Sequence, residues 1–271
     1  MTRIALITGA AQGIGFATAK AFLANGFSGV LLLDRQADKL AQAQKRLGPR
    51  AKIITGDLRD GALPGQAVAL ALKTFGQLDV LVNAAGNTER CGLDDTTPEA
   101  FDRLFDVNVK APLFLMQEAV KPMRAAKSGV IINVSSMLAH GGPPNLTTYS
   151  ASKAALVTMT KSAANAVKRE GIRIFAINLG WVHTDGEQAL QTSFHGQPED
   201  WAKEIGRRMP AGRLITADDV AGLMLFLVSP PAQMMTGAVI DYEQMPAGTF
   251  DAHPALSSPS GEEGARAFAG R

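Results

Sequence analysis

Short runs of apolar, often β-branched residues alternate with longer alanine-rich segments of helical period along this chain. Apolar runs of this kind, without polar alternation, are typical of strands that are buried on both faces of a parallel sheet. The predicted strands are Ile4–Thr8, Val30–Asp34, Lys52–Thr55, Val80–Asn83, Val130–Val134, Ile172–Ile177 and Ala238–Asp241.

Between these runs, the spacing of apolar residues predicts helices. They are expected near residues 13–25, 36–47, 62–75, 99–126, 150–169 and 217–228. Regular alternation of strands and helices indicates an α/β fold, with a doubly wound parallel sheet of about seven strands and helices on both faces. No linker divides the chain before about residue 245, so residues 1–245 are expected to form one domain.

Two stretches interrupt the alternation. Residues 185–212 are rich in polar and aromatic side chains, and an insertion of this kind is either a lid or binding loop, or disordered. Residues 246–271 are rich in Pro, Gly, Ser and Ala, which predicts an extended or partly disordered tail.

Composition and charge narrow the class of protein. The formal net charge is +2 and no basic run stands out, so a nucleic-acid partner is not expected. The single cysteine, Cys91, excludes an internal disulfide and a metal site built on paired cysteines, and it fits a reducing compartment. No run approaches the roughly 20 apolar residues of a membrane span, and the amino terminus has no signal-like leader. We therefore expect a soluble cytoplasmic protein with no membrane partner.

A glycine-rich segment, Thr8-Gly-Ala-Ala-Gln-Gly-Ile-Gly15, joins the first predicted strand to the first predicted helix. Its glycines permit a tight turn and let backbone amides approach a pyrophosphate, and the helix start adds the positive end of its dipole. The spacing differs from G-x-G-x-x-G, and a glycine cluster alone is most often a turn. Its position, with an acidic residue about 20 positions later, favours a dinucleotide site. The expected contacts from this loop are Gly9, Gln12, Gly13, Ile14 and Gly15.

The acidic residue is Asp34, at the end of the second predicted strand. A carboxylate there can accept hydrogen bonds from the ribose hydroxyls of adenosine and repels a 2′-phosphate, which favours NAD. Arg35 leaves NADP open, because its guanidinium can bind that phosphate, whereas Gln12 brings no positive charge into the loop. Asp57 and Leu58, just past the third strand, either flank the adenine or form a simple turn.

Tyr149 and Lys153 lie four residues apart and so share one face of a predicted helix. An ammonium close to the phenol stabilises the phenolate, so we expect the pKa of Tyr149 to fall below its usual value of about 10. Tyr149 is therefore a candidate proton donor and acceptor. The spacing is common by chance, and it gains weight from the independent glycine loop.

Together these motifs make the chain resemble the short-chain dehydrogenase/reductases of the single-domain, nicotinamide-dependent type. The resemblance covers roughly residues 1–243 and implies a Rossmann-type fold that exchanges a hydride between a secondary alcohol or ketone and the nicotinamide. The motifs that carry it are Thr8–Gly15, Asp57, Asn83-Ala-Ala-Gly86, Asn108, Ser136, Tyr149 with Lys153, and Asn178-Leu-Gly-Trp-Val-His-Thr184. Ala84 and Leu179 depart from the family pattern, which more often has asparagine and proline there.

The resemblance implies catalytic roles for four residues. Tyr149 would exchange a proton with the substrate oxygen, and Lys153 would lower the tyrosine pKa and bind the nicotinamide ribose. Ser136, which the family spacing favours over Ser135, would hold the substrate oxygen. Asn108 would order a water next to Lys153, mend an irregularity of its helix, or do both.

The remaining coenzyme contacts that the resemblance implies follow the fourth and sixth strands, the last two of them at the nicotinamide carboxamide. They are Asn83, Ala84, Gly86, Val182 and Thr184.

The helix near residues 150–169 carries a stripe of small apolar residues: Ala155, Met159, Ala163 and Val167. Such a stripe allows another helix to approach closely, and the resemblance implies dimer pairing through this face. Part of the stripe is expected to pack against the chain's own sheet. A homo-oligomer, either a tetramer or a dimer, is therefore expected.

Substrate contacts are expected in the insertion and in the loop after Ser136. Polar side chains there suit a sugar or polyol better than a steroid or an acyl chain. The candidates are Asp185, Glu187, Gln188, Gln191, His195, Trp201, His140 and Asn145. No cluster of ligands accompanies His140 or His183, so no metal site is expected.

The sequence thus predicts an NAD-dependent oxidoreductase that interconverts a secondary alcohol and a ketone, with a sugar or polyol as the small-molecule substrate. An NADPH-dependent ketoreductase of 3-oxoacyl thioesters, with Arg35 on the 2′-phosphate, is the enzymatic alternative. A non-catalytic dinucleotide-binding scaffold is disfavoured, because Asn108, Ser136, Tyr149 and Lys153 are all present.

Overall fold

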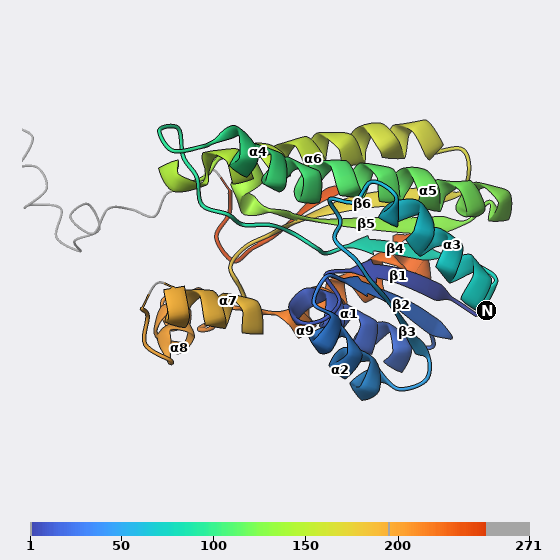
Figure 1. The fold of residues 1–271 in the computed structure, drawn as a ribbon, viewed down its shortest axis with the longest axis horizontal. Coiled ribbons are helices and arrows are strands. Elements are labelled where there is room, and N and C mark those ends of the chain that lie inside the picture. Colours follow the sequence, from blue (N-terminus) through green and yellow to red (C-terminus); the bar gives the residue numbers. More distant parts are fainter. Residues whose placement is uncertain (1, 195, 248–271) are drawn as a thin grey trace, which may run out of the picture.

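The structure, a computed structural model, describes residues 2–194 and 196–247. Within these residues, parallel strands form a seven-stranded sheet in the order β3-β2-β1-β4-β5-β6-β9 (Figure 1). The order reverses between β1 and β4, and doubly wound folds bind ligands in the crevice outside the carboxyl ends of the strands at such a point. The strands are β1 Ile4–Thr8, β2 Gly29–Asp34, β3 Ala51–Thr55, β4 Val80–Asn83, β5 Gly129–Ser136, β6 Ile172–Leu179 and β9 Val239–Tyr242.

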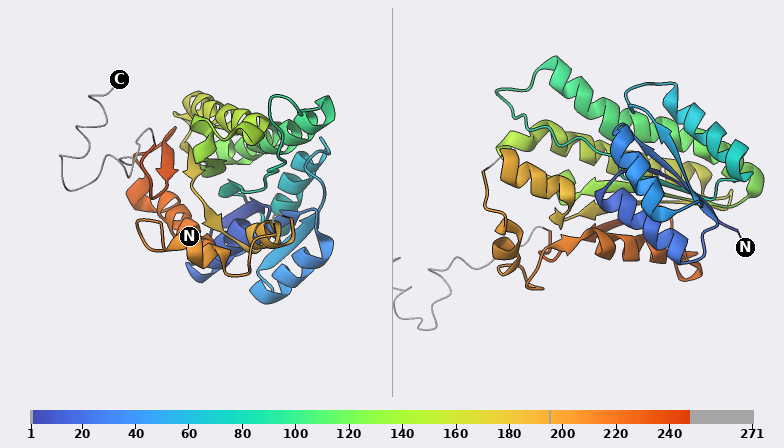
Figure 2. Two further views of the ribbon diagram at one scale, coloured as in Figure 1. Left: turned by 90° about the vertical axis from the view of Figure 1, so that its left-hand side faces the viewer. Right: turned by 60° about the horizontal axis from the view of Figure 1, so that its bottom comes forward.

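Helices connect the strands and cover both faces of the sheet (Figures 1 and 2). In the described part of the chain they are α1 Gly13–Ala24, α2 Ala37–Leu47, α3 Leu63–Phe75, α4 Pro98–Phe105, α5 Ala111–Ala126, α6 Thr147–Val167, α7 Asp185–Ala189, α8 Trp201–Gly206 and α9 Ala217–Leu227. None of the helices in residues 2–194 and 196–247 has the length and hydrophobicity of a membrane-spanning segment.

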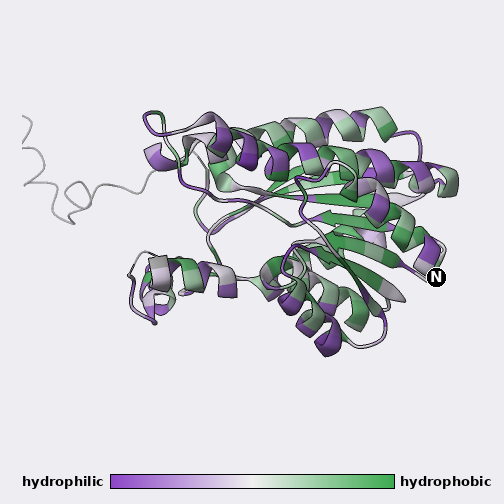
Figure 3. Cartoon of the chain, in the orientation of Figure 1, coloured by the Kyte–Doolittle hydropathy of each residue, from purple (hydrophilic) through white to green (hydrophobic). Residues whose placement is uncertain are grey.

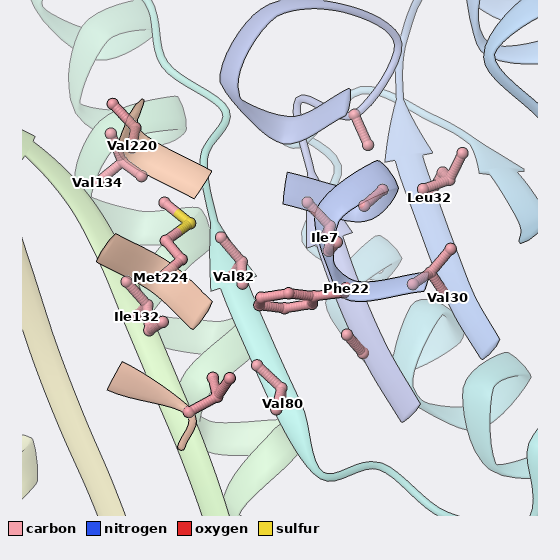
Figure 4. Packing of buried hydrophobic residues seen from close by; sticks show 14 of the residues in the cluster. Ile7, Phe22, Val30, Leu32, Val80, Val82, Ile132, Val134, Val220 and Met224 are labelled. Carbon is pink, nitrogen blue, oxygen red and sulfur yellow. The ribbon is translucent and has the colours of Figure 1, made fainter. Parts of the chain in front are cut away.

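Alternate residues of each strand face opposite layers, and both layers are apolar. On one side, Ile7, Val82 and Ile132 pack with Phe22 of α1 and Met224 of α9 (Figure 4). On the other side, neighbouring strand residues pack against α3, α5 and α6. Figure 3 shows the result, with hydrophobic strands inside and the hydrophilic residues gathered on the helices. Burial on both faces explains why the strands appear in the sequence as continuous apolar runs.

The predicted fold class, a Rossmann-type doubly wound sheet, is confirmed. Several element boundaries differ from the prediction, and two of these differences concern residues of the predicted site. Strand β5 continues to Ser136, because Ser135 and Ser136 pair with Asn178 and Leu179 of β6. The single helix predicted for residues 99–126 is interrupted by a π-helical turn, Asp106–Lys110, between α4 and α5. Asn108 lies inside that turn, and π-turns are frequent at functional sites.

The insertion at residues 185–212 contains α7 and α8, at the end of the molecule toward which the strands point (Figures 1 and 2). A short parallel pair, β7 Val182–His183 with β8 Ile215–Thr216, ties the start of this segment to its end. We call residues 181–206 the lid segment below. The predicted tail lies outside the described residues from position 248 onward.

Candidate active site

A cleft of about 790 Å³ runs along the carboxyl ends of the strands, between the sheet and the lid segment. Nearly all of the residues predicted from sequence to form the site line it. They are Gly9, Gln12, Gly13, Ile14, Gly15, Asp34, Arg35, Asp57, Leu58, Ala84, Gly86, Ser136, Tyr149, Lys153, Val182 and Thr184. Asn83 and Asn108 lie behind the wall of the cleft.

The glycine loop has the close backbone packing expected of a pyrophosphate site. Gly9 has φ +64°, and a Cβ there would lie 2.8 Å from the Cα of Ala85. A Cβ on Gly15 would collide with the carbonyl of Gly9. Helix α1 begins at Gly13 without a side-chain cap, so the first backbone N–H groups of the helix are available at the cleft. This arrangement fits the phosphates of a dinucleotide.

Asp34 is buried at the base of the adenosine end of the cleft. One carboxylate oxygen accepts a hydrogen bond from the backbone N–H of Ala11 at 3.1 Å, and the other accepts from Gln36 at 3.0 Å. A carboxylate oxygen has two lone pairs, so each retains the capacity to accept a ribose hydroxyl. Asp34 therefore fixes the glycine loop and also places a negative charge beside the expected ribose.

One residue near the loop was missed by the sequence reasoning. The Nζ atom of Lys39, from α2, donates to Oε1 of Gln12 at 2.8 Å. Gln12 itself brings no charge into the loop, as expected, but α2 places a cation next to it. A lysine five residues after the end of a strand belongs to no sequence motif that would mark it as a site residue. Only the packing of α2 brings Lys39 to the glycine loop.

Asp57 forms the turn that was one of its two expected roles. Its carboxylate accepts from the backbone and side chain of Arg59, with Nη2 to Oδ2 at 2.7 Å, which stabilises a turn. The hydrogen bonds from Arg59 hold the pKa of Asp57 below its usual value. Asp57, Leu58 and Arg59 also line the cleft, so this turn forms part of the wall.

Tyr149 lies near the amino end of α6 and is 8 % exposed. Burial raises the pKa of its phenol to about 12, and a hydrogen bond with Ser136 opposes that shift only in part. The expected lowering of the Tyr149 pKa is therefore wrong for this arrangement. The negative charge of Glu187 raises the pKa further.

Lys153 is buried next to Tyr149 on the same helix, α6, and lines the cleft. Its Nζ atom donates to the carbonyl of Val134 at 2.9 Å and lies 5.7 Å from the centroid of the Tyr149 ring. Burial lowers the pKa of Lys153 itself to about 8. A Cβ on Gly86 would lie 3.6 Å from Nζ, so the glycine leaves the lysine open toward the cleft.

The two adjacent serines at the end of β5 make different contacts with α6. The Ser135 hydroxyl is buried and donates to the carbonyl of Lys153 at 3.2 Å. Ser136, the next residue in the strand, faces the opposite way and reaches the phenol of Tyr149. Side chains alternate along a strand, so one of the pair had to face away from the substrate.

Asn83, which was expected to contact the coenzyme, does not line the cleft. Its amide is buried and donates to Oδ1 of Asn133 at 2.8 Å, and Asn133 in turn donates to Thr160 of α6. Asn83 therefore joins two strands and a helix behind the cleft. The backbone after it, from Ala84 to Asn87, forms the cleft wall.

Of the substrate candidates in the lid segment and the loop after Ser136, only Glu187 lines the cleft in the described part of the chain. Trp201 is buried behind it, Gln188 and Gln191 bond to other lid residues, and His140 and Asn145 are exposed elsewhere. His195 lies outside the described residues. Trp181, which sequence reasoning did not single out, lines the cleft with 39 % of its surface exposed.

Comparison with known proteins agrees with this geometry. The model of the family described as short chain dehydrogenase matches residues 3–193. Galactitol 2-dehydrogenase of Agrobacterium fabrum (strain C58) is 35 % identical over 232 residues, which is 84 % of this chain and 90 % of that protein. The 3alpha-hydroxysteroid dehydrogenase of Mediterraneibacter gnavus is 35 % identical over 245 residues, covering 89 % and 95 %.

Among solved structures, a variant of actinorhodin polyketide ketoreductase crystallised with NADPH superimposes with a TM-score of 0.83. It is 27 % identical, and the match covers 90 % of this chain and 96 % of the ketoreductase. The protein belongs to the short-chain dehydrogenase/reductase family. It is an oxidoreductase that acts on CH–OH groups, interconverting a secondary alcohol and a ketone with a nicotinamide dinucleotide.

Proposed function

We propose that this enzyme is an NAD-dependent dehydrogenase of a sugar or polyol. The observation that carries the proposal is the pair of carboxylates in one cleft: Asp34 at the adenosine end and Glu187 near Tyr149. The carboxylate of Asp34 disfavours a 2′-phosphate on the coenzyme. The carboxylate of Glu187 disfavours an apolar or anionic substrate at the reacting end of the cleft.

The residues of the cleft would hold the coenzyme in a defined order. The start of α1 would bind the pyrophosphate, Asp34 the adenosine ribose, and Val182 with Thr184 the nicotinamide end. Thr184 caps α7 by accepting a hydrogen bond from the N–H of Glu187 at 3.1 Å, so its position is fixed by the lid segment. When bound, the nicotinamide accepts or delivers the hydride.

Three side chains would handle the substrate oxygen. Tyr149 gives or takes the proton, and Ser136 donates a hydrogen bond to the same oxygen while fixing the phenol. Lys153, held by Val134, places an ammonium behind the phenol and below the expected nicotinamide ribose. Asn108 would act as a positioning residue, because its side chain is fully engaged with the backbone behind Gly86.

The relatives alone do not select the substrate. A galactitol dehydrogenase and a hydroxysteroid dehydrogenase are equally similar to this chain. The charged Glu187 side chain in the cleft is therefore the reason to prefer a hydroxylated substrate, since an unpaired carboxylate is costly to bury against a steroid.

A panel of sugars and polyols, assayed with NAD and NADP, tests the proposal. We expect NADH formation with at least one polyol and a kcat/KM at least tenfold higher with NAD than with NADP. Replacing Asp34 with alanine should reduce that preference, because the repulsion of the 2′-phosphate is removed. Activity confined to steroids, apolar ketones or acyl thioesters would contradict the substrate assignment.

An NADPH-dependent ketoreductase of 3-oxoacyl thioesters is the second candidate, and specific cations favour it. Arg35 and Arg59 line the adenosine end of the cleft, and Lys39 lies beside Gln12. Arg59 is already paired with Asp57, whereas neither Arg35 nor Lys39 has a carboxylate partner within residues 2–194 and 196–247, so these two are the candidate phosphate-binding groups. If the double variant Arg35→Ala/Lys39→Ala loses NADP activity and the wild type prefers NADPH, this candidate replaces the first.

A homo-oligomer in the cytoplasm remains our prediction for the assembled enzyme. The outer helices α5 and α4 expose Leu113, Phe114 and Phe101, each at least 40 % accessible, and apolar groups of this kind favour a protein interface. Within the stripe on α6, Val167 is buried in the chain's own core, while Met159 is half-buried. Light scattering of the wild type and of Phe114→Glu distinguishes an oligomer built on this face from a monomer.

A further inference from the structure

Glu187 is held in a fixed position at the reacting end of the cleft. Its Oε1 atom accepts hydrogen bonds from Nε1 of Trp181 at 2.9 Å and from Nε2 of Gln191 at 2.8 Å. Gln191 is buried, so the carboxylate is anchored from inside the lid segment. Because Oε1 has both of its lone pairs engaged, the orientation of the second oxygen, Oε2, is also determined.

The second oxygen of this carboxylate has no partner. Within residues 2–194 and 196–247, Oε2 accepts no hydrogen bond, and no lysine, arginine or histidine pairs with Glu187. The side chain lines the cleft and is only half-buried, so a molecule in the cleft can reach it. The carboxylate therefore offers one free acceptor to a molecule in the cleft, close enough to Tyr149 for its charge to raise the pKa of that phenol.

An aromatic surface lies beside this acceptor. The Trp181 ring lines the cleft and packs on Trp201, with ring centroids 5.3 Å apart. Trp201 is 3 % exposed and donates to Oε1 of Gln188 at 2.9 Å, which fixes the second ring. His183 packs edge-on against Trp201 and bonds to the same glutamine. Trp201 and His183 therefore hold the Trp181 ring in place. The hydrogen bond from Nε1 of Trp181 sets the position of this ring relative to Glu187.

We infer that Glu187 and Trp181 form a substrate-recognition site that binds a hydroxyl group of the polyol next to the carbon that is oxidised. Oε2 accepts the hydrogen bond of this second hydroxyl, and the face of the Trp181 ring packs against the C–H groups of the same carbon chain. Both residues determine specificity and neither takes part in the proton or hydride transfer. The inference rests on the proposed function, since it assigns the residues that select the polyol.

The chemical properties of Glu187 and Trp181 disfavour other kinds of substrate group at this site. A carboxylate accepts hydrogen bonds but cannot donate them, so a ketone or ether oxygen at this point gains nothing from it. An anionic substrate, such as a hydroxy acid with its carboxylate at this position, is repelled. An alkyl chain would pack on Trp181 but would desolvate Oε2 without pairing it, which costs free energy.

Glu187→Gln tests the inference, because glutamine keeps the shape and can still accept a hydrogen bond through Oε1. Steady-state kinetics with saturating NAD would compare a hexitol with 2-hexanol, which lacks the additional hydroxyls. Losing a charge-assisted hydrogen bond should raise KM for the hexitol about 10- to 100-fold. When each protein is assayed at its own pH optimum, so that the effect of Glu187 on the pKa of Tyr149 does not enter, the kcat for the hexitol and the kinetics with 2-hexanol should change less than threefold.

Asp185→Asn is the matched control. Asp185 lies in the same first turn of α7 and is exposed, and it does not line the cleft, so the charge change is equal and the site is untouched. The KM of the Asp185→Asn variant for the hexitol should stay within twofold of the wild-type value. A third variant, Trp181→Phe, keeps a ring but removes the Nε1 donor, and it should raise KM for the hexitol as the carboxylate loses its anchor.

The outcomes separate this inference from the proposed function. If the wild type oxidises the hexitol and Glu187→Gln does so with unchanged KM, the recognition site is refuted while the polyol function stands. If the wild type oxidises no sugar or polyol, both are refuted. Equal effects of Glu187→Gln on the hexitol and on 2-hexanol would show a general loss of lid structure and would also refute the inference.

Discussion

The side chain of Asn108 binds both backbone groups of Asn87. Its Oδ1 atom accepts from the N–H of Asn87 at 2.8 Å, and its Nδ2 atom donates to the carbonyl of Asn87 at 2.9 Å and to Oγ of Ser152 at 3.0 Å. The π-turn of residues 106–110 therefore joins the loop after β4 to helix α6. A single buried amide fixes the backbone that forms the cleft wall in front of Lys153.

Replacing Asn108 with alanine should lower the free energy of unfolding by about 2–3 kcal/mol, because buried partners lose their hydrogen bonds. It should also lower kcat, since the loop after Gly86 is no longer held. Urea denaturation and steady-state assays measure the two effects. The control is Asn165→Ala, where the amide is exposed and bonds only to Lys168; its stability should stay within about 0.5 kcal/mol. An Asn108→Ala variant as stable as this control would contradict the structural role.

Tyr149→Phe should reduce kcat by about 10²- to 10⁴-fold, because the proton carrier is removed while the ring stays in place. The dissociation constant for NADH, measured by fluorescence, should be nearly unchanged. The other tyrosine of the chain provides the control: Tyr242 donates to the carbonyl of Asp219 in α9, away from the cleft, so Tyr242→Phe should keep its activity. Full turnover by Tyr149→Phe would remove Tyr149 from the mechanism.

The pH dependence of alcohol oxidation should follow the raised pKa of Tyr149. The groups that face this phenol are Ser136 from β5, Lys153 from α6 and Glu187 from α7. Oxidation needs the phenolate as the base, and burial raises the pKa of the phenol to about 12, so kcat/KM for oxidation should rise with pH from 7 to 10. Ketone reduction, which needs the protonated phenol, should not rise over the same range. Glu187→Gln should move the pH profile of oxidation to lower pH, because removing the negative charge of Glu187 lowers the pKa of the Tyr149 phenol.

Lys153→Met should change the dependence of stability on pH. The pKa of Lys153 falls from 10.5 to about 8 on burial, so between these values the unfolded chain binds more protons than the folded chain. The free energy of unfolding of the wild type should therefore rise with pH relative to the variant, by on the order of 2 kcal/mol between pH 8 and 9.5. Urea denaturation of both proteins at several pH values measures this difference. A difference that is flat or falls with pH would show that Lys153 is not buried as a charge.

Gly9→Ala should weaken coenzyme binding and destabilise the protein by more than the strain of a positive φ alone. A methyl group there meets the backbone of Ala85, which cannot move without displacing the loop after β4. Gly26→Ala is the matched control: this glycine has φ +86° and open space around it, so the substitution should cost only about 1–2 kcal/mol. Thermal denaturation with and without NADH compares the two. Equal effects of both substitutions would mean that the close approach of Ala85 is unimportant.

The amino-acid sequence determined the sheet, the glycine loop and the spacing that makes Tyr149 and Lys153 the candidate catalytic pair. The strands and helices could be predicted because each depends on local period and composition, and the strands are buried on both faces. Gly9, Asp34, Tyr149 and Lys153 could be placed because they follow strand ends or share a helix face. These features depend on residues close together in the chain.

Only the tertiary structure decided which side chains face the cleft and how they are charged. Asn83 turns away from the cleft to bond with Asn133, and Lys39 reaches Gln12, because strand register and helix packing bring distant segments together. The sign of the Tyr149 pKa shift was predicted wrongly for the same reason. A spacing of four residues places an ammonium near a phenol, but burial, which depends on the whole fold, determines which form of the phenol is stable.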